Sequence, residues 1–212
     1  MKIKHWMTRN PVTVKPDTPI LEASKLMKEH RIRRLPVVDK GQVVGIVTYR
    51  KLIEASPSDA TSLSIYELNY LIAKLQVKDV MEKDPICVSP EDSVVDVVIM
   101  GHEKGIGAFP VVERGRLVGI VTETEIYRAF VGLLGSPAEN TIIAVENIDL
   151  EQRIGALSRI TSIVEGLGVP VMAAFSLPHR NSPGHRVHLR LKTKNVAPVV
   201  AELQKNGYRL GS

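Results

Sequence analysis

Two threonines stand where an apolar, strand-like run gives way to a helix-like run, and each precedes a charged residue by three positions. Thr48 precedes Lys51, and Thr122 precedes Glu125. The first turn of a helix has unpaired backbone N–H groups and the positive end of the helix dipole, which favour an anion or a polyhydroxyl group. A carboxylate there accepts hydrogen bonds from hydroxyl groups, whereas an ammonium suits phosphate. The alternative roles are helix N-caps for the threonines and solvated surface residues for Lys51 and Glu125.

A basic cluster, residues 30–34 (HRIRR), lies just before the first of two similar apolar segments. The corresponding residues before the second segment, 104–108 (KGIGA), carry little charge. Such a cluster is usually a solvated face, but here the segments differ in charge while their apolar positions agree. We therefore expect Arg33, Arg34 and Arg50 to supply charge-assisted hydrogen bonds to phosphate groups.

These residues belong to two copies of one unit, since LPVVDKGQVVGIVT at 35–48 is repeated as FPVVERGRLVGIVT at 109–122. Met7 corresponds to Met81 at the same offset of 74 residues (81 minus 7), and no gap is needed between them. Neither copy is long enough to bury a good core alone. We therefore expect the copies to pack together as one pseudo-two-fold domain.

Each copy predicts a short strand, a helix, a β-hairpin and a second helix. In the first copy, prolines bound the short strand at residues 12–14, and Thr18 is the expected N-cap of the first helix, as Asp92 is in the second copy. A charged turn containing Gly41 separates the two hairpin strands. Residues 65–75 predict an additional core helix between the copies.

A different pattern follows a linker at residues 135–137 (GSP). Residues 139–212 predict strand, helix, two strands, helix and strand, an order that is ferredoxin-like. We therefore divide the chain into residues 1–138, with repeat one at about 1–76 and repeat two at about 77–134, and residues 139–212. The first helix of the second part should bury an apolar stripe made of Ile154, Leu157, Ile160, Val164 and Leu167.

The composition is that of a soluble globular protein, with 44% hydrophobic and 24% charged residues in 212. The single cysteine, Cys87, cannot form an internal disulfide, and no apolar run approaches the length of a membrane span. The amino terminus lacks an apolar signal core. We therefore expect a cytoplasmic protein without a membrane partner. A net charge of +5 is a thin excess and does not favour nucleic acid as a partner.

The paired units resemble CBS domains, whose hallmark is a PVV hairpin leading to a glycine, two apolar residues and a threonine before the last helix. This resemblance implies an adenosine derivative held in the cleft between the repeats. In that family an aspartate typically stands three residues after the threonine and binds ribose; here Lys51 and Glu125 replace it. The expected nucleotide-binding residues are Thr13, Arg33, Arg34, Pro36, Thr48, Arg50, Lys51, Cys87, Pro110, Thr122 and Glu125.

Residues 140–212 resemble an ACT domain, a βαββαβ module that in its family often binds amino acids and dimerises through its sheet. Gly155 stands where that family's glycine opens the first helix, and the resemblance implies an amino-acid site from Asp149 to Gly155. Ile154 replaces the proline common before that glycine. A CBS pair followed by an ACT-like module resembles the family of acetoin-utilisation accessory proteins. The fold class is therefore α/β (α+β), with a tandem CBS pair and a C-terminal ferredoxin-like ACT-type domain.

The sequence contains no phosphate loop of the Gly-Lys-Ser type, no nucleophile elbow and no metal-ligand helix motif. We therefore predict no enzyme activity, no catalytic residue, no required cofactor and no metal site. His179, His185 and His188 do not have the positions of a metal site, because His188 belongs to a strand and the others to a loop. Cys87 is expected to be a small, partly buried residue rather than a nucleophile.

The first functional hypothesis is a non-enzymatic sensor that binds AMP, ADP, ATP or S-adenosylmethionine and acts on a regulated enzyme. Its ACT-like part, either a dimerisation module only or an amino-acid-binding module, passes on or receives the change across a dimer. The second is an interaction scaffold whose clefts are empty, which Lys51 would permit. The third is nucleic-acid binding through residues 30–34, although no aromatic side chains accompany those arginines. A homodimer is the expected assembly for modules of both kinds.

Overall fold

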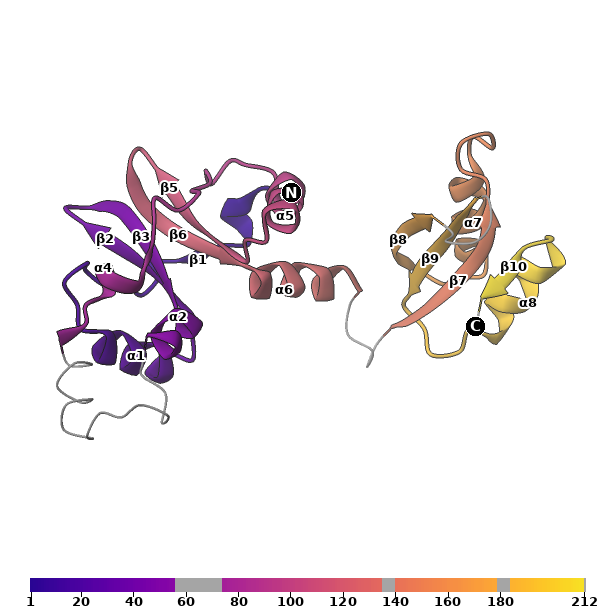
Figure 1. Cartoon of the computed structure of the whole chain (residues 1–212). Helices are drawn as coiled ribbons and strands as arrows, with labels where there is room; N and C mark the ends of the chain where they lie inside the picture. Colours follow the sequence, from indigo (N-terminus) through magenta and orange to yellow (C-terminus); the bar gives the residue numbers. More distant parts are fainter. Residues whose placement is uncertain (56–73, 135–139, 179–183, 212) are drawn as a thin grey trace. The chain divides into compact units, whose positions relative to one another are not determined.

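The fold is described from a computed structural model, which describes residues 1–55, 74–134, 140–178 and 184–211 (Figure 1). The predicted linker at 135–137 lies outside these residues. The predicted helix at 65–75 also lies outside them, except for its last two residues. The chain divides into two compact units, Met1–Tyr127 and Arg128–Ser212. Among the described residues, no helix combines the length and the apolar character that crossing a membrane requires.

The elements of the first unit follow the predicted plan of two similar repeats, with one correction. Residues 12–14 form only an isolated bridge at Val14, and the short strand lies earlier, at Thr8–Arg9. Repeat one contains η1 (Ile3–His5), β1 (Thr8–Arg9), α1 (Ile20–Glu29), β2 (Arg34–Asp39), β3 (Gln42–Thr48) and α2 (Tyr49–Glu54). Repeat two contains α4 (Val77–Val80), β4 (Glu82–Lys83), α5 (Val94–Lys104), β5 (Ala108–Glu113), β6 (Arg116–Thr122) and α6 (Glu123–Leu134). The boundary between the two compact units lies between Tyr127 and Arg128, within α6, and the predicted division at residues 138 and 139 stays a prediction. Phe130 and Val131, in the second half of this helix, are 56% and 61% exposed.

The predicted β-hairpins are present in both repeats, where β2 pairs antiparallel with β3 and β5 with β6. Lys40 and Gly41 have φ values of 46° and 84°, and Arg114 and Gly115 have values of 50° and 76°. Two successive residues with positive φ give the turn the backbone twist that matches the twist of the flanking strands. The glycine in each turn therefore sets the register of the hairpin.

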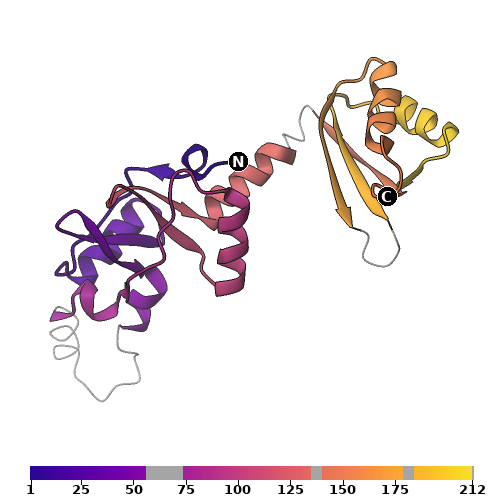
Figure 2. The ribbon, with the colours of Figure 1, turned by 90° about the horizontal axis from the view of Figure 1, so that it is seen from above.

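The opening segments of the two repeats exchange places. Strand β1 pairs with β6 of repeat two, aligning Thr8 with Ile120, while β4 pairs with β3 of repeat one, aligning Glu82 with Ile46. Figures 1 and 2 show the indigo strand β1 beside the pink strand β6. Ile3, in the preceding turn, is fully buried in the core of repeat two. Each repeat therefore completes the other, although the sequence-based division assigned residues 1–76 to a single repeat.

The glycine of each second hairpin strand lets the exchanged segment approach closely. A Cβ on Gly119 would lie 2.7 Å from the sulfur of Met7 and 3.0 Å from the carbonyl oxygen of Thr8. A Cβ on Gly45 would lie 2.5 Å from the sulfur of Met81. All three distances are shorter than van der Waals contact. The repeated methionine of one repeat therefore packs against the repeated glycine of the other repeat.

The hydrophobic cores of the first unit also contain residues from both repeats. Buried residues of repeat one form a cluster that includes Val77 from the opening of repeat two, and a smaller cluster of Ile46, Ala108 and Ile120 joins the two hairpins. Neither predicted N-cap is correct: α1 begins at Ile20 after Pro19, and α5 begins at Val94 after Ser93. Thr18 and Asp92 instead accept hydrogen bonds from the backbone N–H groups of Lys15 and Ser89, which closes the turn before each helix.

The second unit has the predicted order of elements. It contains β7 (Thr141–Ile148), α7 (Ala156–Gly166), β8 (Val171–Pro178), β9 (His185–Leu191), α8 (Ala197–Lys205) and β10 (Arg209–Gly211), with the sheet order β10-β7-β9-β8. Ile160 and Val164 of α7 are buried as predicted, but Leu157, Leu167 and Ile154 are 38%, 42% and 90% exposed. Ile154 lies outside the helix because Gly155, with a φ of 81°, breaks the backbone path before the helix begins at Ala156.

The close approach at Gly119 predicts a loss of stability in the Gly119→Ala variant. The added Cβ would press on the backbone carbonyl of Thr8, which cannot move without disturbing β1, so the free energy of unfolding should fall by about 1–3 kcal/mol. Chemical denaturation of the full chain measures this change. The control is Gly132→Ala in α6, where an added Cβ meets no heavy atom within 4 Å. An equal loss in both variants would contradict the packing role of Gly119.

Candidate functional site

The rim of the first hairpin brings together two of the predicted ligand-binding residues. Arg34 begins β2 directly opposite Thr48, the last residue of β3. The hydroxyl of Thr48 accepts a hydrogen bond from the backbone N–H of Lys51 at 3.3 Å and so caps α2. The hairpin register, and not the sequence spacing, places the guanidinium-bearing residue beside this helix start.

The rim of the second hairpin has a different chemistry. The backbone N–H of Thr122 donates to Glu125 Oε2 at 3.0 Å, its hydroxyl donates to the same oxygen, and the hydroxyl of Thr8 donates to Glu125 Oε1 at 3.2 Å. Glu125 is only 7% exposed. Its carboxylate therefore holds the exchanged strand β1 against the start of α6, a structural role in addition to any contact with a ligand.

Arg34 reaches across from repeat one to repeat two. Its Nη2 lies 3.4 Å from Oε2 of Glu123, the first residue of α6. A Cβ on Gly107 would lie 2.5 Å from the same nitrogen. The side chain of Arg34 is 28% exposed and that of Glu123 is 59% exposed. The small residues that replace the basic cluster in repeat two therefore make room for the arginine of repeat one.

The other predicted cationic residues are not brought into this group. Nε of Arg50 lies 2.6 Å from Oε1 of Glu54, and Nζ of Lys51 lies 3.7 Å from its Oε2. The hydrogen bond from Arg50 lowers the pKa of Glu54 and raises that of Arg50 itself. Arg33 is exposed, and its carbonyl accepts from the backbone N–H of Tyr49. Arg34 is thus the predicted cation that lies between the repeats.

The segments that carry Thr13 and Cys87 run beside the hairpins. The N–H of Val14 donates to the carbonyl of Pro36, and the N–H of Val88 donates to the carbonyl of Pro110, at 3.2 and 3.0 Å. Cys87 is exposed rather than partly buried as predicted, and its sulfur donates to the carbonyl of Pro85. Desolvation by the surrounding atoms raises the pKa of its thiol.

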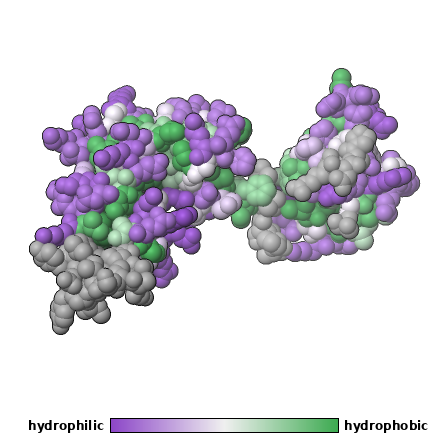
Figure 3. Space-filling model, in the orientation of Figure 1, coloured by the Kyte–Doolittle hydropathy of each residue, from purple (hydrophilic) through white to green (hydrophobic). Residues whose placement is uncertain are grey.

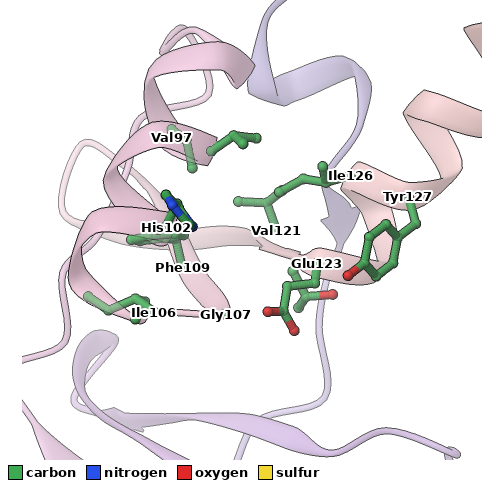
Figure 4. Close-up of a pocket in the computed structure, with 13 residues that line it drawn as sticks. Val97, His102, Ile106, Gly107, Phe109, Val121, Glu123, Ile126 and Tyr127 are labelled. Atoms are coloured by element: carbon green, nitrogen blue, oxygen red, sulfur yellow. The ribbon is translucent and has the colours of Figure 1, made fainter. Parts of the chain in front are cut away.

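Repeat two contains a cavity of about 380 Å³ that the sequence did not reveal. In Figure 4, side chains from α5 and β5, including Val97 and Phe109, face Ile126 and Tyr127 of α6 across the cavity, and Glu123 lies beside Gly107. In repeat one the position equivalent to Ile126 is Leu52, which is 3% exposed within the core. The cavity therefore arises where α6 packs less closely than α2.

On the molecular surface, apolar residues lie among hydrophilic ones (Figure 3).

The second unit contains a polar cavity, also of about 380 Å³, at the start of α7. Asp149 lines it and accepts a hydrogen bond from the N–H of Gln152 at 2.9 Å, and Gly155 forms the N-cap of the helix. Three arginines that the sequence analysis did not select also line it, namely Arg153, Arg159 and Arg209. The cavity thus offers both carboxylate and guanidinium groups.

Of the three histidines considered as metal ligands, His188 has a packing role, and His179 lies outside the described residues. His188 stacks on Phe175 with ring centroids 4.9 Å apart, and burial lowers its pKa. Within the described residues, no three His, Cys, Asp or Glu side chains come together as metal ligands would.

Comparisons with known proteins agree with the geometry of the first unit. The family model for the CBS domain matches residues 3–58 and 77–132. The inosine-5'-monophosphate dehydrogenase of Korarchaeum cryptofilum is 30% identical over 81% of this chain and 38% of its own length. Protein MJ1225 of Methanocaldococcus jannaschii is 28% identical over 60% of this chain and 46% of its own length. The chain thus spans less than half the length of these curated relatives.

Solved structures cover the same part of the chain. A protein designated the acetoin utilization protein AcuB, from Vibrio cholerae, has a TM-score of 0.54 at 30% identity, covering 63% of this chain and 93% of that chain. The CBS domain pair of protein MJ0100, in complex with 5'-methylthioadenosine and S-adenosylmethionine, has a TM-score of 0.52 at 30% identity, covering 62% and 97%. CBSX2 in complex with AMP has a TM-score of 0.51 at 30% identity, covering 62% and 96%.

The two matched segments carry the hairpins, the exchanged strands and the candidate rim residues described above, and they make up more than half of the sequence. The chain therefore belongs to the CBS domain family.

Proposed function

We propose that this chain is a non-enzymatic regulatory protein that senses an adenine nucleotide at the cleft between its repeats. The observation that carries the proposal is the position of Arg34, which lies opposite the helix cap Thr48 and reaches Gly107 of repeat two. A guanidinium beside a helix start is suited to a phosphate group. The complexes of related CBS pairs with AMP and with S-adenosylmethionine support this ligand class.

The two rims then have unequal parts in binding. Arg34 holds the phosphate end of the nucleotide, and Thr48 presents the start of α2 to it. Thr122 takes the adenosine end, with its hydroxyl oriented by Glu125. AMP, ADP and ATP fit this arrangement better than S-adenosylmethionine, because Arg34 favours an anionic group.

Sensing also requires that the ligand bind two geometries of the repeats unequally. Strand β1 of repeat one pairs with β6 of repeat two, and β4 of repeat two pairs with β3 of repeat one. A movement of one hairpin would therefore displace a strand that belongs to the other repeat. We further propose that the protein acts as a homodimer on a regulated enzyme. In this proposal the second unit is an ACT-like module that receives or passes on the change.

The polar cavity of the second unit supports amino-acid binding by this module. Asp149 lies at one part of its wall and the arginines Arg153, Arg159 and Arg209 line it as well. A free amino acid carries an ammonium and a carboxylate, which these side chains would pair with. Ile154, where the ACT family commonly has proline, is exposed and does not line the cavity.

Arg34→Ala should weaken AMP binding far more than adenosine binding. A hydrogen bond to a charged group contributes about 1.5–3 kcal/mol, so the Kd for AMP should rise roughly 10- to 100-fold while that for adenosine changes little. Calorimetric titration of the full chain measures both values, with Arg116→Ala as a control of equal charge change. Equal losses for the two ligands would contradict the phosphate role. Absence of binding to AMP, ADP, ATP and S-adenosylmethionine at millimolar concentration would refute nucleotide sensing.

Glu125→Ala should destabilise the first unit, because Thr8 and Thr122 lose their shared acceptor. The expected decrease in the free energy of unfolding is about 1–3 kcal/mol. Glu113→Ala, at the exposed end of β5 in the same hairpin, removes the same charge and should change stability little. If Glu125→Ala instead leaves stability unchanged and only weakens nucleotide binding, its carboxylate is a direct ribose ligand and the structural role is wrong.

Amino-acid binding by the second unit is tested by thermal unfolding of the full chain with each of the common amino acids. At least one should raise Tm, and Arg159→Ala should abolish that increase by removing the partner of the ligand carboxylate. Arg128→Ala, outside the cavity, is the matched control. A panel in which no amino acid changes Tm would count against this part of the proposal.

A further inference from the structure

Arg34 already has an anionic partner within the protein. Its guanidinium lies 3.4 Å from the carboxylate of Glu123, beside the proposed phosphate position. The residue equivalent to Glu123 in repeat one is Tyr49. Only repeat two therefore has a carboxylate at this position. Gly107 leaves the space in which this pair forms.

This ion pair is of a kind that a phosphate can displace. The side chain of Glu123 is 59% exposed, and exposed ion pairs contribute little stability. A phosphate carries more charge than one carboxylate and can accept two parallel hydrogen bonds from a guanidinium. A nucleotide phosphate therefore competes successfully for Arg34, whereas a neutral nucleoside leaves the pair intact.

We propose that Glu123 is a specificity-determining residue, an internal competitor that phosphate must displace from Arg34. This inference rests on the proposed nucleotide site. Displacement breaks a direct contact between the two repeats, and it does so at the first residue of α6, the helix that spans the boundary between the units. Ligand occupancy is thereby linked to the start of α6, and ligands without an anionic group do not release it.

Glu123→Gln should tighten AMP binding about 3- to 5-fold, because the competing charge is removed, and should leave the affinity for adenosine unchanged. Glu123→Asp, which keeps the charge but shortens its reach, should give a smaller gain. The matched control is Glu113→Gln, an equal change in charge at the opposite end of the β5–β6 hairpin. Calorimetry of the full chain with AMP and adenosine provides the affinities.

The gain should disappear when Glu123→Gln is introduced into the Arg34→Ala variant, because no guanidinium is left to compete for. An equal gain in Glu113→Gln, a gain for adenosine as large as for AMP, or a gain that persists without Arg34 would each overturn the role of Glu123. Nucleotide binding by the wild type with unchanged affinity in Glu123→Gln overturns this inference and leaves the proposed function standing. Absence of AMP binding in both proteins overturns the two together.

Discussion

The first unit depends on one close backbone contact made twice. Gly45 and Gly119 lack a side chain where Met81 and Met7 cross them, and this lets β4 and β1 pair with the hairpin of the other repeat. Each core also contains an apolar residue from the partner repeat, Val77 in one and Ile3 in the other. Because neither sheet nor core is complete alone, the repeats fold as a pair.

On this symmetric frame the rims differ by a few side chains. Arg34 from repeat one occupies the space above Gly107, and Glu123 meets it from repeat two. Glu125, equivalent to Lys51, is turned inward and bonded to Thr8 and Thr122. The rims therefore differ in charge although their hairpins match. The proposed preference for phosphate-bearing ligands rests on this difference.

Much of the local structure could be predicted from residue types. The turns at Gly41 and Gly115 and the apolar alternation around them specify hairpins in both copies. The exchanged strands could not be predicted, because β1 and β4 are two-residue, polar and exposed segments without any periodic signal. Ile154 was assigned to a buried stripe by its spacing, but the left-handed backbone at Gly155 delays the helix. Periodicity identifies a helix more reliably than it locates its first turn.

The sequence by itself determined the repeat, its family, the asymmetry of the rims and the identity of the residues that carry charge. These properties follow from comparing residues at matching positions, for which no coordinates are needed. Only the tertiary structure decided that Arg34 meets Glu123 and Gly107, that Arg50 pairs with Glu54, and that Glu125 is buried. The physical reason is that a long side chain has many rotamers of similar energy, and the partner that selects one is brought near by the fold, from a residue distant in the sequence.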